Sequence, residues 1–327
     1  MVIDADPQKR KWIELAGANP SLVSDFRPAL VSFLAFTRSS LPKFAGTGYV
    51  IAGNAEGALV VTAKHVLQEG VLRAQKPESA AACTGIFVQA SSITPSIDPK
   101  KLRAVWMGSK SAEMLKVVYV EYNNVLDIAV CWIMPEEKNS AQFEPRSVPL
   151  DIATPQVGDI VHMASLDRLK AYETKAPTSP KGEGQTLKIE TRVSIRIGKV
   201  TGVYPNGLRQ YRWPCFTTSI PAEPGMSGGL VTIPRELQTV GACGVICADN
   251  SSKIARKNQR KSGESIIALT WPVLILRVPT MSTDSAPRLS IYDMMLAGNI
   301  ERALGDLTRV NIVDRGNDER TIDLRPE

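Results

Sequence analysis

The segment Pro224–Leu230 places a serine among glycines, directly before an apolar run. It reads Pro-Gly-Met-Ser-Gly-Gly-Leu. A glycine at 225 lets the backbone turn, so we expect the amides of Gly225 and Ser227 to point at one spot. Two such amides form an oxyanion hole, in which one donor is worth about 3 kcal/mol to a tetrahedral transition state. The segment predicts an exposed nucleophile at Ser227, and a plain glycine-rich turn is the alternative.

A serine hydroxyl needs an adjacent base to act as a nucleophile. The chain has only two histidines, so only two residues are candidates for a histidine base. His65 ends the run Ala-Leu-Val-Val-Thr-Ala-Lys-His, which predicts a position at the C-terminal end of a buried strand. His162 alternates with apolar neighbours, which predicts a histidine packed within a strand of the second half of the chain. His65 is therefore the candidate base.

Asp127 opens a second apolar run, Asp-Ile-Ala-Val-Cys-Trp-Ile. A carboxylate in such a place is costly to bury unless it is paired. A hydrogen bond to an imidazole would supply the pairing and hold the ring in one tautomer. An ordinary aspartate at the start of a strand is the alternative.

Short apolar and β-branched runs, broken by Gly, Pro and Asn, are typical of an all-β barrel or sandwich. In the first half we expect strands at 29–36, 48–51, 58–63, 85–90, 102–107, 116–121 and 127–133. In the second half we expect them at 158–164, 191–204, 216–220, 229–233, 239–248 and 265–278. The polar stretch Pro135–Pro149 between the halves is typical of a linker. About six strands on either side of it favour two barrels packed against each other.

The three candidate residues occur in the order His, Asp, Ser, with separations of 127 − 65 = 62 and 227 − 127 = 100 residues. Thr62-Ala-Lys-His65, Asp127-Ile-Ala-Val and Gly225-Met-Ser-Gly-Gly resemble the three signature segments of trypsin-like serine peptidases of the bacterial intracellular type. The resemblance covers about residues 29–280. It implies an all-β, chymotrypsin-like fold of two six-stranded antiparallel β-barrels with the active site in the cleft between them.

The same resemblance implies a serine endopeptidase that needs no metal or organic cofactor and acts on a protein or peptide substrate. Ser227 would attack the scissile carbonyl, His65 would act as general base and acid, and Asp127 would orient His65. The expected domains are an N-terminal extension (1–28), a first barrel (29–149), a second barrel (150–285), and a C-terminal helical segment and tail (286–327).

Two departures from the family bear on regulation and specificity. Met226 stands where digestive trypsins carry an aspartate, so we expect no activation by insertion of a new N-terminus. By the resemblance, Ser219–Glu223 and Ala242–Asn250 would wall the specificity pocket. Pro221 falls near its base, where an aspartate would dictate Arg or Lys. The second wall aligns in two ways, so that either Gly244 or Cys247 would pair with the substrate backbone.

Composition excludes several classes of protein. The net charge is +6 with a pI near 9.0, but the positive residues are scattered, so nucleic-acid binding is not expected. No apolar run approaches the roughly 18 residues that a membrane span needs, and the N-terminus does not resemble a signal peptide. Five irregularly spaced cysteines favour reduced thiols and a cytoplasmic location. Cys243 and Cys247, about 13 Å apart on one strand face, are too distant for one metal.

The sequence also predicts the structure of four segments other than the expected strands. A short helix is expected near Pro7–Ala16, and residues 173–190 have the composition of a mobile surface loop. Residues 290–307 show helical periodicity, with an interruption at Gly298–Asn299. The basic run 253–261 is interpreted as a solvated loop, or alternatively as a border for acidic substrates.

Two alternatives to a constitutively active peptidase stay open. The first is a catalytically silent binding scaffold that keeps both barrels. The second is a latent protease whose oxyanion loop is ordered by a regulatory partner protein or ligand. The intact set of motifs argues against the first alternative.

Overall fold

The computed structural model describes most of the chain. The described residues are 12–17, 19–35, 42–68, 97–108, 112–123, 126–136, 143–175, 185–208, 211–234, 240–249, 264–280, 287–314 and 320–325. The expected strand 85–90 and the basic run 253–261 lie outside these ranges.

The first barrel is a closed antiparallel sheet of six strands in the order β2-β3-β4-β7-β6-β5. The strands are β2 (Leu30–Ala35), β3 (Lys43–Asn54), β4 (Gly57–Thr62), β5 (Leu102–Met107), β6 (Ala112–Tyr122) and β7 (Ala129–Pro135). A tight turn joins β3 to β4, in which the side chain of Asn54 accepts hydrogen bonds from the amides of Glu56 and Gly57. β4 is rich in β-branched residues and buried along its whole length, as expected for a central strand.

The second barrel also closes on itself, because β8 pairs with both β9 and β11. Its strands are β8 (Ile160–Lys175), β9 (Gln185–Tyr204), β10 (Cys215–Thr218), β11 (Leu230–Thr232), β12 (Ala242–Asp249) and β13 (Ser265–Leu269). The two-residue strand β1 (Ile13–Glu14) adds to the outside of β9. Two closed six-stranded antiparallel barrels confirm the fold class expected from the sequence.

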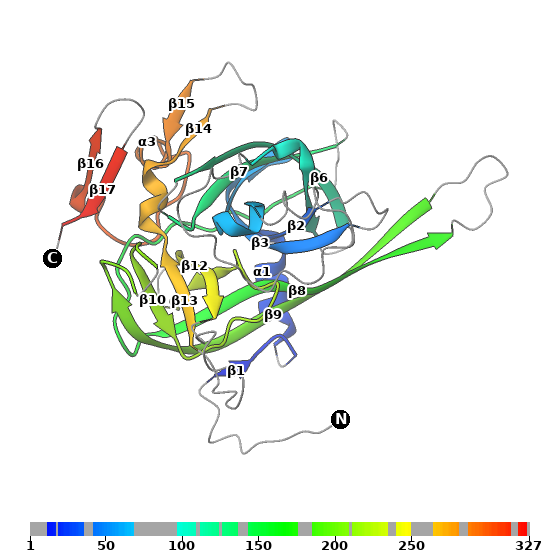
Figure 1. Cartoon of the computed structure of the whole chain (residues 1–327), viewed down its shortest axis with the longest axis horizontal. Coiled ribbons are helices and arrows are strands. Elements are labelled where there is room, and N and C mark those ends of the chain that lie inside the picture. The colour runs from blue at the N-terminus through cyan, green and yellow to red at the C-terminus, as the bar shows by residue number, and fades with distance from the viewer. Residues whose placement is uncertain are drawn as a thin grey trace.

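Most of the elements that are not barrel strands lie toward the two ends of the chain (Figure 1). Near the N-terminus are α1 (Pro20–Phe26) and the 3₁₀ turn η2 (Arg27–Ala29). A further 3₁₀ turn, η3 (Pro99–Lys101), precedes β5. After β13 come η5 (Trp271–Ile275), β14 (Arg277–Pro279), β15 (Arg288–Ser290), α3 (Ile291–Leu296), η6 (Leu307–Arg309), β16 (Val310–Asp314) and β17 (Arg320–Leu324).

The helix expected at 290–307 is wrong beyond its first turns, because α3 ends at Leu296. The amide of Gly298 donates to Met295 and that of Asn299 to Met294, the two bonds of a Schellman motif. Gly298 has φ +76°, a conformation in which glycine is favoured. The interruption expected at Gly298–Asn299 is therefore the end of the helix.

Three other expectations for secondary structure need correction. Of the helix expected at 7–16, residues 13–14 are a strand, and the helix near the N-terminus is α1, which begins after Asn19 caps it and Pro20 occupies its first turn. The loop expected at 173–190 is strand at both ends, because β8 and β9 continue into the long hairpin that projects in Figure 1. The strand expected at 265–278 stops at Leu269, and Pro272 lies in η5.

Candidate active site

Pairing of β4 with β7 brings His65 and Asp127 together. Thr62 at the end of β4 lies opposite Ala129 at the start of β7, so the residues just beyond these ends are neighbours. His65 lies in a helical turn at 64–68, immediately after β4. Its Nδ1 lies 2.8 Å from Oδ2 of Asp127, and its backbone amide donates to Oδ1 at 3.0 Å. Because an ionised carboxylate only accepts, this contact favours the tautomer with the proton on Nδ1.

The two side chains of this pair differ in exposure. The Asp127 side chain is 13% exposed and that of His65 is 37% exposed. The carboxylate is thus screened from water while part of the ring stays accessible. Lys64 lies beside the pair, and its amide donates to the carbonyl of Asp127 at 3.3 Å. Burial lowers the pKa of the Lys64 ammonium, and the charge of Asp127 offsets part of that effect.

Ser227 lies in a tight turn that is hydrogen-bonded to β12. The amide of Met226 donates to Glu223 at 3.0 Å, and that of Gly229 donates to Met226 at 2.9 Å. The amide of Gly228 donates to the carbonyl of Ile246 at 2.7 Å. Gly225 and Gly228 have φ +97° and +82°, so the turn requires glycine on both sides of Met226–Ser227.

Thr47 of β3 joins the first barrel to this turn. Its amide donates to the carbonyl of Ser227 at 2.8 Å. Its hydroxyl lies 3.1 Å from the carbonyls of both Gly225 and Leu166, and it accepts from the amide of Leu166 at 3.1 Å. Thr62 of β4 in turn donates to the carbonyl of Thr47 at 2.6 Å. These bonds fix the serine turn of the second barrel against the histidine strand of the first.

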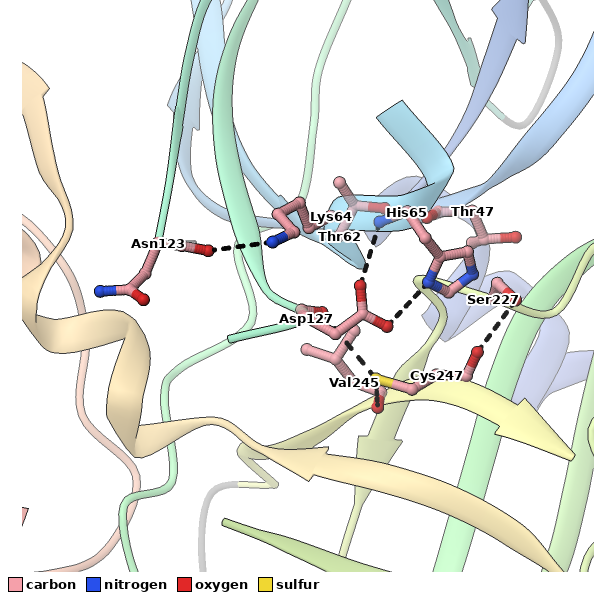
Figure 2. Close-up of polar contacts among 9 residues, drawn as sticks. All are labelled: Thr47, Thr62, Lys64, His65, Asn123, Asp127, Ser227, Val245 and Cys247. Carbon is pink, nitrogen blue, oxygen red and sulfur yellow. Dashed lines mark hydrogen bonds and ion pairs between the residues drawn. The ribbon is translucent and has the colours of Figure 1, made fainter. Parts of the chain in front are cut away.

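Figure 2 shows the imidazole of His65 between Asp127 and Ser227. The Ser227 hydroxyl donates to the carbonyl of Cys247 at 3.4 Å. The thiol of Cys247 lies 3.9 Å from the Asp127 carbonyl and 3.5 Å from that of Val245. Burial, followed by the nearby charge of Asp127, raises the pKa of this thiol well above its usual value, so it stays neutral.

The amides of Gly225 and Ser227 are the expected oxyanion donors. In the part of the chain that the structure describes, neither donates a hydrogen bond to the protein. The carbonyl of Gly225 faces Thr47, as its hydrogen bond requires. A Cβ atom on Gly225 would lie 2.6 Å from the ring of Phe44, which leaves no space for a side chain on that side.

The residues expected to govern specificity lie in three different settings. The carbonyl of Pro221 accepts from Nη1 of Arg196 at 3.2 Å. Gly244 is enclosed in the barrel wall, paired with Val231 and Leu269. Cys247, three residues further along β12, is the one whose carbonyl contacts Ser227.

Thr47 and Arg196 are two residues of the site region that sequence reasoning missed. The glycines on both sides of Thr47 are the signal that could have found it. A Cβ atom on Gly46 would lie 2.8 Å from the carbonyl of Ser227, and one on Gly48 would lie 2.7 Å from the Phe33 ring. Two glycines that flank a single residue within a strand indicate a close approach of backbones.

The described residues hold no cluster of three or more His, Cys, Asp or Glu side chains arranged to bind a metal ion. Among the helices in the described ranges, none has the length and apolar character to cross a bilayer. Cys131, Cys215, Cys243 and Cys247 are all free thiols and all buried.

The two barrels fit a chymotrypsin-like fold. No protein-family model matches the chain, and no curated protein matches it significantly. The function must therefore be argued from the geometry of the residues themselves.

Proposed function

We propose that this protein is a serine endopeptidase that hydrolyses peptide bonds through Ser227, His65 and Asp127. The observation that carries the proposal is the His65–Asp127 pair, bonded at 2.8 Å, set beside a serine turn from the other barrel. A paired, partly exposed imidazole next to a serine between glycines supports nucleophilic catalysis.

In the proposed mechanism, Nε2 of His65 takes the proton of the Ser227 hydroxyl as Oγ attacks the substrate carbonyl carbon. Asp127 stabilises the imidazolium that forms and keeps the ring in place. The amides of Gly225 and Ser227 donate to the oxyanion of the tetrahedral intermediate. The imidazolium then gives its proton to the leaving amine, which leaves an acyl group on Ser227. Water, activated by His65, hydrolyses this ester and restores the enzyme.

Contacts with substrate follow from the surroundings of Ser227. The carbonyl of Cys247 adjoins the Ser227 hydroxyl, whereas the backbone of Gly244 is already committed to two neighbouring strands. We therefore assign Cys247, rather than Gly244, to the pairing with the substrate backbone. Pro221 precedes the serine turn and borders the specificity pocket in this proposal.

One observation favours a latent form of the same enzyme. The Ser227 hydroxyl donates to the carbonyl of Cys247 at 3.4 Å, a contact that competes with donation to His65. In this proposal the active form is the Ser227 rotamer whose hydroxyl would donate to the imidazole instead. A partner protein or a bound substrate that favours this rotamer would switch the peptidase on.

A fluorophosphonate probe tests the proposal. The wild type should become labelled at Ser227, and Ser227→Ala should abolish labelling, while Ser24→Ala, at an exposed serine of α1, should not change it. His65→Ala should slow peptide hydrolysis by about 10⁶-fold, because triad members act as a unit. Mass spectrometry of the labelled peptide identifies the site. Labelling of Ser227→Ala at the wild-type rate, or none in the wild type, would contradict the proposal.

A further inference from the structure

Arg196 of β9 is a buried cation whose partners come from two separate segments of the chain. Its side chain is 5% exposed. Nε donates to Glu14 at 3.1 Å, and Nη2 lies 2.9 Å from a carboxylate oxygen of Glu223. Nη1 donates to the carbonyl of Pro221 at 3.2 Å. The planar fork of a guanidinium can meet all three acceptors at once, which a lysine ammonium cannot do in the same geometry.

The first partner segment is Trp12–Leu15, close to the N-terminus. Glu14 also accepts from the hydroxyl of Ser194 at 2.9 Å and from the amide of Ile195 at 3.0 Å. Leu15 donates to the carbonyl of Ile195 at 2.7 Å, which continues the pairing of β1 with β9. The Trp12 ring lies 4.7 Å from the guanidinium carbon of Arg196, within cation–π range. This segment thus covers Arg196 and supplies one of its two carboxylates.

The second partner segment leads directly into the proposed nucleophile. Glu223 accepts from the amide of Met226 at 3.0 Å, and its own amide donates to the Met226 sulfur at 3.3 Å. Met226 is fully buried and precedes Ser227. Glu223 holds Met226 through these two backbone contacts, while its carboxylate is held by Arg196. A continuous set of contacts therefore runs from Glu14, through Arg196 and Glu223, to the turn that carries Ser227.

The exposures of the two carboxylates indicate which of them separates from Arg196 more easily. The Glu223 side chain is 45% exposed and can be hydrated if Arg196 leaves it. The Glu14 side chain is 24% exposed and has three protein partners, so it is the firmer anchor. Removal of the Glu14 charge leaves a buried guanidinium short of a counter-charge, which favours its movement toward water.

We propose that Arg196 is a positioning residue of the peptidase, through which the docked segment Trp12–Leu15 holds Pro221–Ser227 in its catalytic conformation. This inference rests on the proposed function. It assigns the N-terminal segment a regulatory role: its release from β9 disorders the turn that presents Ser227 and the oxyanion amides. Met226 excludes the ion pair of digestive trypsins, and the Arg196 contacts brace the same turn from another strand.

The test compares Glu14→Gln, Glu223→Gln and the double variant in the full chain. The control is Glu136→Gln, which removes the carboxylate of a 2.8 Å pair with Arg103 in the first barrel. Two measurements are made: the rate of fluorophosphonate labelling at Ser227, and hydrogen–deuterium exchange of the peptide that covers residues 221–230. We expect each single variant to slow labelling about tenfold, less than the 10²–10³ lost with an oxyanion donor. Exchange in 221–230 should rise in both.

The labelling rate of the double variant should be no lower than that of the slower single variant, because both substitutions interrupt the same set of contacts. Glu14→Asp, which keeps the charge, should restore part of the labelling rate. Glu136→Gln should match the wild type in both measurements.

A purely structural role for Arg196 predicts another result: Glu14→Gln would lower the melting temperature but leave labelling and exchange in 221–230 unchanged under native conditions. That result, or additive losses in the double variant, would overturn the inference. Exchange does not depend on catalysis. If wild-type Ser227 fails to label, the proposed function fails, and exchange alone still decides whether Glu14 is coupled to the 221–230 turn.

Discussion

Gly228 shows how closely the backbone after Ser227 approaches the first barrel. A Cβ atom at this position would lie 1.9 Å from the carbonyl of Thr47 and 2.3 Å from the hydroxyl of Thr62. The residue also has φ +82°, which L side chains rarely adopt. Two separate physical reasons thus require glycine here: the positive φ, and the close approach to Thr47 and Thr62. This approach brings the turn that carries Ser227 against the barrel that carries His65.

Replacement of Gly228 by alanine should therefore separate or distort the two halves of the candidate site. We expect Gly228→Ala to destabilise the protein by about 2–5 kcal/mol, from backbone strain of about 1–2 kcal/mol plus overpacking of about 1–3 kcal/mol. Labelling of Ser227 should be lost. Urea denaturation measures the first effect and a fluorophosphonate probe the second.

Gly158→Ala is the matched control for this prediction. Gly158 has φ +98°, but a Cβ atom there would meet nothing within 4 Å. Gly158→Ala should lower the free energy of unfolding only by the backbone strain of about 1–2 kcal/mol, and labelling of Ser227 should stay at the wild-type rate. Equal costs for the two substitutions would mean that the contact with Thr47 has no energetic weight.

At the scale of one element, β8 contains the other histidine of the chain. His162 lies opposite Ile197 of β9 and Thr232 of β11, as the alternating pattern around it predicted. Burial lowers the pKa of its imidazole below the usual 6.5, because the charged form loses hydration. The unfolded chain therefore binds a proton at this residue more readily than the folded protein does.

This difference makes stability depend on pH in a defined direction. The contribution of His162 to the free energy of unfolding is fully present above pH 6.5 and is lost as the pH falls below that value. The reason is that the pKa of His162 is lower in the folded protein than in the unfolded chain. We expect the contribution of this group to the free energy of unfolding to fall as the pH drops below 6.5, with a slope of at most about 1.4 kcal/mol per pH unit.

His162→Gln should reduce that slope, whereas His65→Gln should keep the part due to His162. Urea denaturation at a series of pH values measures both. An unchanged slope in His162→Gln would show that its burial does not govern its protonation.

At the scale of the whole molecule, both barrels and the C-terminal segment share one hydrophobic core. The core residues run from Ala29 in the first barrel to Val310 near the C-terminus. Buried side chains of the segment after β15, such as Ile291 and Met294, belong to the same cluster. Deletion of residues 286–327 would therefore remove part of the core, and it would test folding rather than regulation.

A shared core predicts that the two barrels unfold together. Cys131 of β7 and Cys243 of β12 are buried free thiols, one in each barrel. Buried thiols do not react in the native state, so each reports the opening of its own barrel. Thiol labelling in increasing urea, read residue by residue by mass spectrometry, should give coincident midpoints for both. Two midpoints separated by a plateau would show that the barrels are independent units.

The local pattern of the sequence was enough to predict much of the fold. β-branched runs such as 58–63 mark buried strands, and glycine-rich breaks mark their ends. The same pattern placed His65 after a strand and Asp127 before one, and the hydrogen bond expected between them is present. Their catalytic roles stay predictions. Where the pattern misled, as at residues 297–307, one glycine with positive φ ended the helix despite continued apolar periodicity.

The sequence by itself determined which residue types could form the site and in which order they occur, because strand and turn preferences are local. Only the tertiary structure decided which carbonyl meets Ser227, how Thr47 joins the barrels, and why Arg196 is buried. Glu14 and Arg196 are separated by 182 positions, and Thr47 and Gly225 by 178. The physical reason is that such contacts arise from barrel closure and packing, which no short stretch of sequence encodes.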